Sequence, residues 1–182
     1  PHYTAVAEIK KRPTRSFPDI PAGLGDHNMV SQSDSLLFNA EVTASSSIEL
    51  YEWLLTQIND GDTGGLGWTS EGEAQDEWVV FDLGAQETIS EVVLHPRGGD
   101  AEAGKFFPLS FRIETSDDGG SWTEVYSHTF SVTDEVTWRV NEPYTCTLDS
   151  AVTTQYLRLY VTDKTNHGSG GYHVQFSEIE AF

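Results

Sequence analysis

The sequence predicts an all-β fold, an antiparallel β-sandwich, from three observations. Short runs rich in Val, Ile, Thr, Tyr and Trp recur along the chain, and turn-forming Gly, Asp and Pro separate them. Within several runs apolar and polar residues alternate, which places the apolar ones on one face of a strand. The one helical pattern, over residues 48–58, is short, and a loop is an alternative for it. We therefore expect two packed sheets rather than a helical domain.

The expected strands can be given in chain order. They span residues 77–83, 89–95, 109–115, 122–126, 155–162 and about 173–182, with Gly84, Pro96 and the turn Asp117-Asp118-Gly119-Gly120 between some of them. In the last run the apolar positions change phase between Phe176 and Ile179. That change predicts a β-bulge near Ser177 and Glu178.

The first 38 residues differ from the rest of the chain. They hold four of the seven prolines and a locally basic stretch, Lys10-Lys11-Arg12. We expect residues 1–38 to be an N-terminal extension or inter-domain connector with one strand over residues 3–9, and residues 39–182 to form the domain. Because the chain starts at Pro1 and has no signal peptide, we also expect it to be a piece of a larger protein.

Charge, hydropathy and cysteine content exclude several partners and structural features. The chain has 10 Lys and Arg against 29 Asp and Glu, a net charge of −19. Nucleic acid and anionic lipid both need a cationic surface, so neither is expected as a partner. No run of 18 apolar residues is present, so no membrane-spanning segment is expected. Cys146 is the only cysteine, which excludes an internal disulfide, and it is expected to be buried in a strand.

An acidic, glycine-rich loop occupies residues 59–68, Asn-Asp-Gly-Asp-Thr-Gly-Gly-Leu-Gly-Trp. Calcium takes six to eight oxygen ligands, and glycines let backbone carbonyls turn inward to supply some of them. An EF-hand is an alternative, but Gly64 stands where that loop needs a side-chain ligand. A polar hairpin turn without metal is the other alternative.

Several motifs, taken in order, resemble one known family. They are Thr43 to Ser47, Ile58 to Asp62, Gly67 to Ser70, Trp78 to Gly84, Leu94 to Arg97, Ile113 to Trp122, Tyr156 to Leu159 and Phe176 to Glu180. Together they resemble the discoidin, or coagulation-factor C-type, domains, over about residues 40–182. The likeness is greatest to bacterial family 32 carbohydrate-binding modules and to the discoidin-like modules of α-L-rhamnosidases. This resemblance implies a discoidin-like jelly roll.

The resemblance also implies a structural Ca²⁺ that joins the acidic loop to the last strand. Its implied side-chain ligands are the carboxylates of Asp60 and Glu178. Its implied backbone ligands are the carbonyls of Gln57, Asp62 and Ser177, with Leu66 or Gly65 in place of a threonine that the family usually has.

A sugar site is expected in the loops at one end of the sandwich, over residues 61–67, 95–107 and 162–172. The expected ligand-binding residues are Arg97, Asp100, Glu102, Lys105, His167 and Tyr172. Arg97 falls where family 32 galactose binders have a hydroxyl-binding arginine, but pairing with Asp100 or Glu102 is an alternative role. Trp53 is a candidate platform for a sugar ring. Trp68, Trp78 and Trp122 match core positions.

These expectations describe a non-catalytic carbohydrate-binding module of a larger secreted or cell-surface protein, joined to a catalytic domain such as a glycoside hydrolase. A galactose-, rhamnose- or fucose-type sugar is the expected ligand. A protein-interaction or spacer module without a sugar site is the main alternative. An enzyme is disfavoured because no zinc-ligand pattern, nucleophile elbow or P-loop is found. Membrane binding is disfavoured by charge, unless Phe106 and Phe107 form an exposed spike.

Overall fold

The computed structural model describes residues 34–72, 76–99, 102–131, 142–164 and 172–182. Those ranges hold seven strands and one 3-10 turn, and every strand pairing is antiparallel. The elements are β1 (Glu41–Ala44), η1 (Leu55–Gln57), β2 (Trp68–Thr69), β3 (Glu77–Pro96), β4 (Ser110–Ser116), β5 (Thr123–Thr129), β6 (Tyr144–Asp163) and β7 (Gln175–Ala181). No helix among the described residues is long and apolar enough to cross a bilayer.

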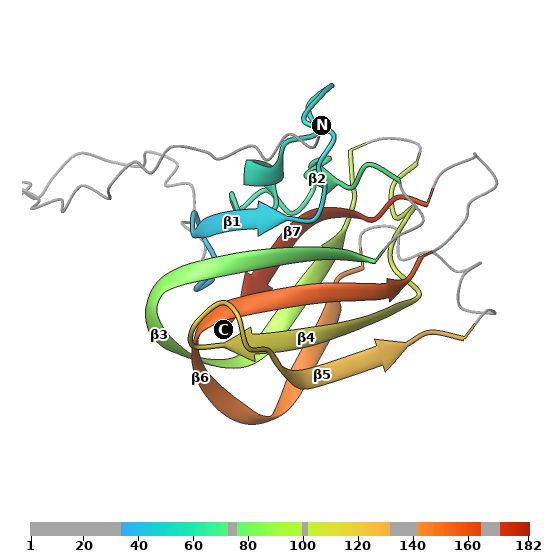
Figure 1. Cartoon of the computed structure of the whole chain (residues 1–182). Coiled ribbons are helices and arrows are strands. Elements are labelled where there is room, and N and C mark those ends of the chain that lie inside the picture. The colour runs from blue at the N-terminus through green and yellow to red at the C-terminus, as the bar shows by residue number, and fades with distance from the viewer. Residues whose placement is uncertain (1–33, 73–75, 100–101, 132–141, 165–171) are drawn as a thin grey trace, which may run out of the picture. The chain divides into compact units, whose positions relative to one another are not determined.

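Two long strands fold a single hydrogen-bonded sheet over into two layers. The strand order is β2-β7-β3-β6-β4-β5, and β1 pairs with the first half of β3. β3 and β6 each span 20 residues, and Figure 1 shows both of them curving back on themselves. The predicted all-β antiparallel sandwich is confirmed.

The two halves of β3 belong to different layers. In one layer residues 79–82 pair with β1, and residues 77–82 pair with residues 156–161 of β6. That part of β6 pairs in turn with β4, and β4 pairs with β5. In the other layer residues 91–94 pair with residues 144–147 of β6 on one side, and the strand end pairs with β7 on the other. The sequence suggested two separate strands here, but the chain forms one bent strand through Gly84 (φ 76°), and its pairing with β6 shifts register between Asp82 and Glu87.

The core lies between the layers and is built from alternate residues of each strand, as period-2 patterning requires. One layer contributes Val79, Phe81, Phe111, Ile113, Leu157, Leu159 and Val161, and the other contributes Val92, Leu94, Cys146, Phe176 and Ile179, all at most 1% exposed. Cys146 is buried as predicted, and desolvation raises the pKa of its thiol to about 12.

The tryptophans divide between core and outer surface. Trp68 is 1% exposed and belongs to the core, as expected. Trp78 is only half-buried, because its neighbour Val79 points inward and alternation turns Trp78 outward. Trp122 is also half-buried, with its ring 4.1 Å from the guanidinium carbon of Arg158. The core assignment of these two tryptophans was therefore wrong.

The predicted bulge in the last strand is present. His95 pairs with Glu178 while the next residue, Pro96, pairs with Phe176. Ser177 is thus the extra residue in β7, which moves Glu178 onto the same inward side as its neighbours. The phase change of the apolar residues located this bulge correctly.

Residues 48–58 form a loop that ends in the short turn η1, not a helix. The apolar spacing suggested a shared face for Tyr51, Leu54, Leu55 and Ile58, but only Ile58 is fully buried. Glu49, Tyr51 and Glu52 have φ values of 52°, 55° and 69°. Left-handed backbone at three positions breaks a right-handed helix, whatever the apolar spacing.

The chain already packs against the sheet from residue 35. The Leu36 N–H donates to the Ala181 carbonyl (2.9 Å), and the Ala181 N–H donates to Ser35 Oγ (3.1 Å). Leu37 is completely buried. The division of the chain at residue 38 stays a prediction, and the expected strand over residues 3–9 lies outside the described residues.

Candidate functional site

The acidic loop and the last strand meet, although they are far apart in the sequence. The backbone N–H of Asp60 donates to Glu178 Oε2 (3.1 Å). The Ile179 N–H donates to the Ile58 carbonyl (2.7 Å), and Ser177 Oγ donates to the Thr63 carbonyl (2.9 Å). The predicted approach of Asp60 to Glu178 is therefore confirmed, with the bulge at Ser177 making it possible.

Glu178 is a buried carboxyl group with half of its hydrogen-bonding capacity unused. Its residue is 0% exposed, and Oε1 is buried without a hydrogen-bond partner. Burial, helped by the nearby charges of Asp60 and Glu180, raises the pKa of Glu178 from 4.5 to about 8, although backbone N–H groups of Gly61 and Asp60 oppose the rise. An ionised carboxylate here needs a compensating positive charge.

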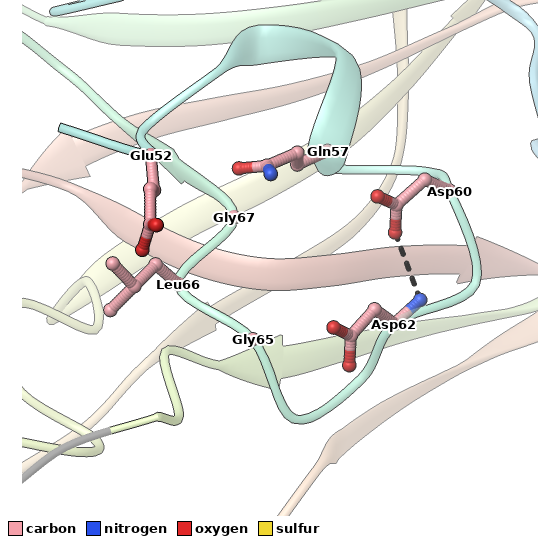
Figure 2. Close-up of a pocket in the computed structure, with 7 residues that line it drawn as sticks. All are labelled: Glu52, Gln57, Asp60, Asp62, Gly65, Leu66 and Gly67. Carbon is pink, nitrogen blue, oxygen red and sulfur yellow. Dashed lines mark hydrogen bonds between the residues drawn. The ribbon is translucent and has the colours of Figure 1, made fainter. Parts of the chain in front are cut away.

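A cavity of about 270 Å³ opens beside this contact. Figure 2 shows the residues that line it: Glu52, Gln57, Asp60, Asp62, Gly65, Leu66 and Gly67. Asp60 Oδ1 accepts from the Asp62 N–H (2.9 Å), which folds the loop around its own carboxylate. Gln57 Oε1 is a second buried oxygen without a hydrogen-bond partner.

Close backbone packing fixes the acidic loop against its neighbours. A Cβ on Gly67 would lie 2.1 Å from the Phe176 carbonyl oxygen, and Gly67 also has φ 75°. A Cβ on Gly98 would lie 2.3 Å from the Gly64 carbonyl oxygen, and the Gly98 N–H donates to the Gly65 carbonyl (2.9 Å). Glycine at these positions lets the acidic loop touch both β7 and the loop after β3.

Arg97 is held inside the loop cluster. It is 5% exposed, and its Nη1 donates to Gln175 Oε1 (3.1 Å). Its guanidinium carbon lies 4.9 Å from the centre of the Trp53 ring, and Nη1 is 3.9 Å from Glu102 Oε2. The pairing with Glu102 considered from the sequence is thus present, and Trp53 stacks on a protein cation.

Three of the other expected sugar-binding residues, Glu102, Lys105 and Tyr172, are among the described residues. Lys105 Nζ pairs with Glu102 Oε1 at 2.8 Å, and Tyr172 is 43% exposed. Asp100 and His167 lie outside the described residues. The assignment of all six residues to sugar binding stays a prediction.

Two further findings concern the exposure of large apolar side chains in the loops. Phe106 and Phe107 are 6% and 1% exposed, so the membrane spike considered for them is absent. The sequence reasoning missed the exposed tip at Leu50 and Tyr51, because the helical spacing suggested an inward face. The same segment, Ile48-Glu49-Leu50-Tyr51-Glu52-Trp53-Leu54-Leu55, gives no sequence signal that sets Leu50 and Tyr51 apart from its other apolar residues.

The arrangement fits the calcium site that the fold family implies. No three His, Cys, Asp or Glu side chains of the described ranges gather into a metal cluster, and backbone carbonyl oxygens would therefore supply most ligands of a cation held here. Glu178 Oε1 and Gln57 Oε1 are buried oxygens without a hydrogen-bond partner, and the exposed carboxylates of Asp60 and Asp62 lie in the adjoining acidic loop, so a cation would be stabilised here. Of the ligand set predicted from the sequence, Asp60, Asp62 and Leu66 lie in the acidic loop, Ser177 and Glu178 lie in β7, and Gln57 ends η1.

Comparison with known proteins finds relatives in sequence and in fold. Porcine (Sus scrofa) lactadherin is 26% identical over 98 residues, which are 50% of this chain and 23% of that protein. The chitosan-binding module 1 of a Paenibacillus sp. IK-5 chitosanase/glucanase is 24% identical, with a TM-score of 0.63 over 82% of this chain and 99% of that one. A family 32 carbohydrate-binding module from Clostridium perfringens, in complex with galactose, is 18% identical, with a TM-score of 0.58 over 79% and 93%.

These solved modules share the fold, and the matched stretch spans less than a quarter of lactadherin. The family model for the F5/8 type C domain matches residues 41–175, which include the acidic loop, both long strands and the start of β7. The chain therefore belongs to the F5/8 type C, or discoidin, domain family.

Proposed function

We propose that this chain is a non-catalytic carbohydrate-binding module that binds a glycan through the end loops of a calcium-stabilised β-sandwich. One observation carries the proposal. The acidic loop, the loop after β3 and the start of β7 meet at one place through the contacts of Gly98 with Gly65 and of Arg97 with Gln175. Loops that are fixed by a rigid scaffold are where binding sites concentrate.

The solved modules of similar fold support a sugar as the ligand. One of them is a chitosan-binding module, and the other is in complex with galactose. A sugar site requires an aromatic ring and a few polar groups. The loops of this chain supply Trp53, Tyr172 and Lys105 for these roles. The proposed mechanism is proximity, in which the module raises the local concentration of an attached catalytic domain at its glycan.

The calcium part of the proposal rests on Glu178. Bound Ca²⁺ would neutralise the carboxylates of Asp60 and Glu178 and so favour the closed contact between the acidic loop and β7. The carbonyls of Gln57, Asp62, Ser177 and Leu66 would complete the ligand set. Extracellular modules bind calcium in roughly the 0.1–1 mM range, which suits a secreted or cell-surface protein. The linked catalytic domain, such as a glycoside hydrolase, is part of the same proposal.

A glycan array probed with the whole chain tests this function. The array is run once with calcium and once with chelator. Each glycan that binds is then titrated into the chain in solution to measure its dissociation constant. We expect saturable binding, on the order of 0.1–1 mM for a single site, because few atoms of a hydrated sugar are desolvated. Galactose, L-rhamnose, L-fucose and glucosamine oligomers must be on the array, and absence of saturable binding to any glycan contradicts the proposal.

A spacer or protein-interaction module is the second candidate. The observation in its favour is that Arg97 is 5% exposed and engaged with Trp53, Gln175 and Glu102, so it offers little surface to a sugar. The same array separates the two functions, because a spacer gives no saturable response to any sugar.

A further inference from the structure

A tight turn carries exposed apolar side chains at the loop end of the molecule. Leu50 is 58% exposed, Tyr51 88% and Leu54 39%. The Trp53 N–H donates to the Leu50 carbonyl (3.0 Å), which closes the turn around Tyr51 and Glu52. A nearly fully exposed tyrosine ring gains nothing from the core, so packing does not account for it.

The backbone of this turn is held in an unfavourable conformation. Tyr51 and Glu52 have φ values of 55° and 69°, the pattern of a type I′ turn, which strongly prefers Asn-Gly. Glu49 is left-handed as well. Non-glycine residues in this region are strained and concentrate at ligand-binding sites.

Contacts at its base hold the turn in place. Glu49 Oε1 accepts hydrogen bonds from Ser47 Oγ and from the Leu55 N–H, the latter at 3.0 Å. The Leu54 N–H donates to the Gly67 carbonyl (3.2 Å), and Trp53 stacks on the buried Arg97. The tip therefore projects from a fixed base that is shared with the acidic loop and the Arg97 loop.

The surroundings of the turn are negatively charged. Glu52 is in the turn itself and Glu49 directly precedes it, and Glu52 lines the cavity together with Asp60 and Asp62. No Lys or Arg is among the described residues that line this cavity. With a chain charge of −19, this surface favours a positively charged ligand.

We propose that the Leu50–Leu54 turn is a binding subsite for amino-sugar oligosaccharides with free ammonium groups. The ring of Tyr51 would stack on the apolar C–H face of one sugar, and the Glu52 carboxylate would pair with an ammonium group. This inference rests on the proposed function and names the ligand class of its site. Glu52 is not among the residues proposed to hold calcium, so both can be occupied together.

Calorimetric titration of the whole chain tests the subsite, at about pH 6 and in constant excess calcium. The two probes are the trimer of β-1,4-linked glucosamine and its fully N-acetylated counterpart, which have the same backbone but differ in charge. We expect the cationic trimer to bind more tightly, and its affinity to fall with added salt. Tyr51→Ala should weaken it about tenfold, Glu52→Gln about threefold, and Tyr51→Phe little.

The exposed acid Glu124, on the edge strand β5, supplies the matched charge control. Glu124→Gln changes the net charge as Glu52→Gln does, and it should leave affinity unchanged. Equal effects of the two variants, or equal affinity for both trimers, would overturn the subsite. If Tyr172→Ala abolishes glycan binding while Tyr51→Ala does not, the subsite fails but the proposed function stands. If no glycan binds at all, both fail.

A double variant separates a ligand-binding role from a structural one. Tyr51→Asn with Glu52→Gly installs the preferred type I′ pair, so it should raise the melting temperature while it removes binding of the cationic trimer. A fall in the melting temperature would show that Tyr51 stabilises the fold, which contradicts the inference. Binding of phosphatidylcholine vesicles that is lost in Tyr51→Ala, without trimer binding, would assign the turn to membranes instead and would also overturn it.

Discussion

Burial of the Glu178 side chain disfavours ionisation of its carboxyl group. It lies in the bulged part of β7, is closed off from solvent, and has Asp60 and Glu180 nearby. These surroundings favour the protonated form, since an ionised carboxylate without a partner is costly inside a protein. The residue is therefore a point at which pH and a bound cation both act on stability.

The resulting pH dependence has a definite sign. The pKa of Glu178 is raised to about 8 in the folded chain, above its ordinary value of 4.5. Between these values the folded state holds a proton that the unfolded state has lost, so stability falls as pH rises. In chelator, the free energy of unfolding should drop by up to about 1.4 kcal/mol per pH unit from pH 5 to 8. Denaturant unfolding at several pH values measures it.

Replacement by the neutral isostere gives the control for this effect. Glu178→Gln should remove most of the pH dependence in chelator and be more stable than the parent chain at pH 8. In saturating calcium the order should reverse, because the parent carboxylate can then ionise beside a cation. A parent chain whose stability in chelator rises from pH 5 to 8 would contradict this view of Glu178.

At the scale of elements, the close contact between the acidic loop and β7 depends on the missing side chain of Gly67. A Cβ at this position would come within 2.1 Å of the Phe176 carbonyl oxygen, and the φ of 75° also opposes substitution. Gly84 provides a matched control, since its φ is 76° and nothing lies within 4 Å of its Cβ position.

The two glycines should therefore respond differently to alanine. Gly84→Ala should cost about 1–2 kcal/mol, which is the strain of the left-handed backbone alone. Gly67→Ala should cost about 2–4 kcal/mol, because a steric clash with β7 is added to the strain. Equilibrium unfolding of both variants measures the difference. Equal losses would mean that the acidic loop does not pack against β7 as closely as described.

Much of this element-level arrangement could be read from the sequence. Alternation placed the core residues of β4 and of the second half of β6, and the phase change in the last strand placed the bulge at Ser177. The approach of Asp60 to Glu178 was predicted from family motifs, because their sequence separation carries no local signal.

Three features could not be predicted, because they depend on backbone conformation and tertiary contacts that residue patterns do not encode. The apolar spacing of residues 48–58 suggested a helix, but left-handed backbone at Tyr51 and Glu52 made a turn. Gly84 marked a strand end in the sequence, whereas β3 continues through it as one bent strand whose pairing with β6 shifts register there. Arg97 was predicted as a sugar ligand from its position, and its burial against Trp53 and Gln175 emerged only from the fold.

At the scale of the whole molecule, one sheet folds into two layers, and loops at one end tie the layers together. β3 and β6 each contribute to both layers, so their continuous ribbons hold the sandwich together away from the loops. At the loop end the connection is made by hydrogen bonds of the acidic loop to Glu178, Ser177 and Ile179. A cation shared by Asp60 and Glu178 would strengthen this end, by about 2.7 kcal/mol at a hundredfold excess over its dissociation constant.

Calorimetric titration of calcium into the chelator-treated chain tests this central claim most directly. We expect one binding site per chain, abolished by Glu178→Gln and by Asp60→Asn but retained in Glu124→Gln, which removes an exposed carboxylate on β5. Absence of a binding isotherm in the parent chain, or an unchanged one in Glu178→Gln, would contradict the account.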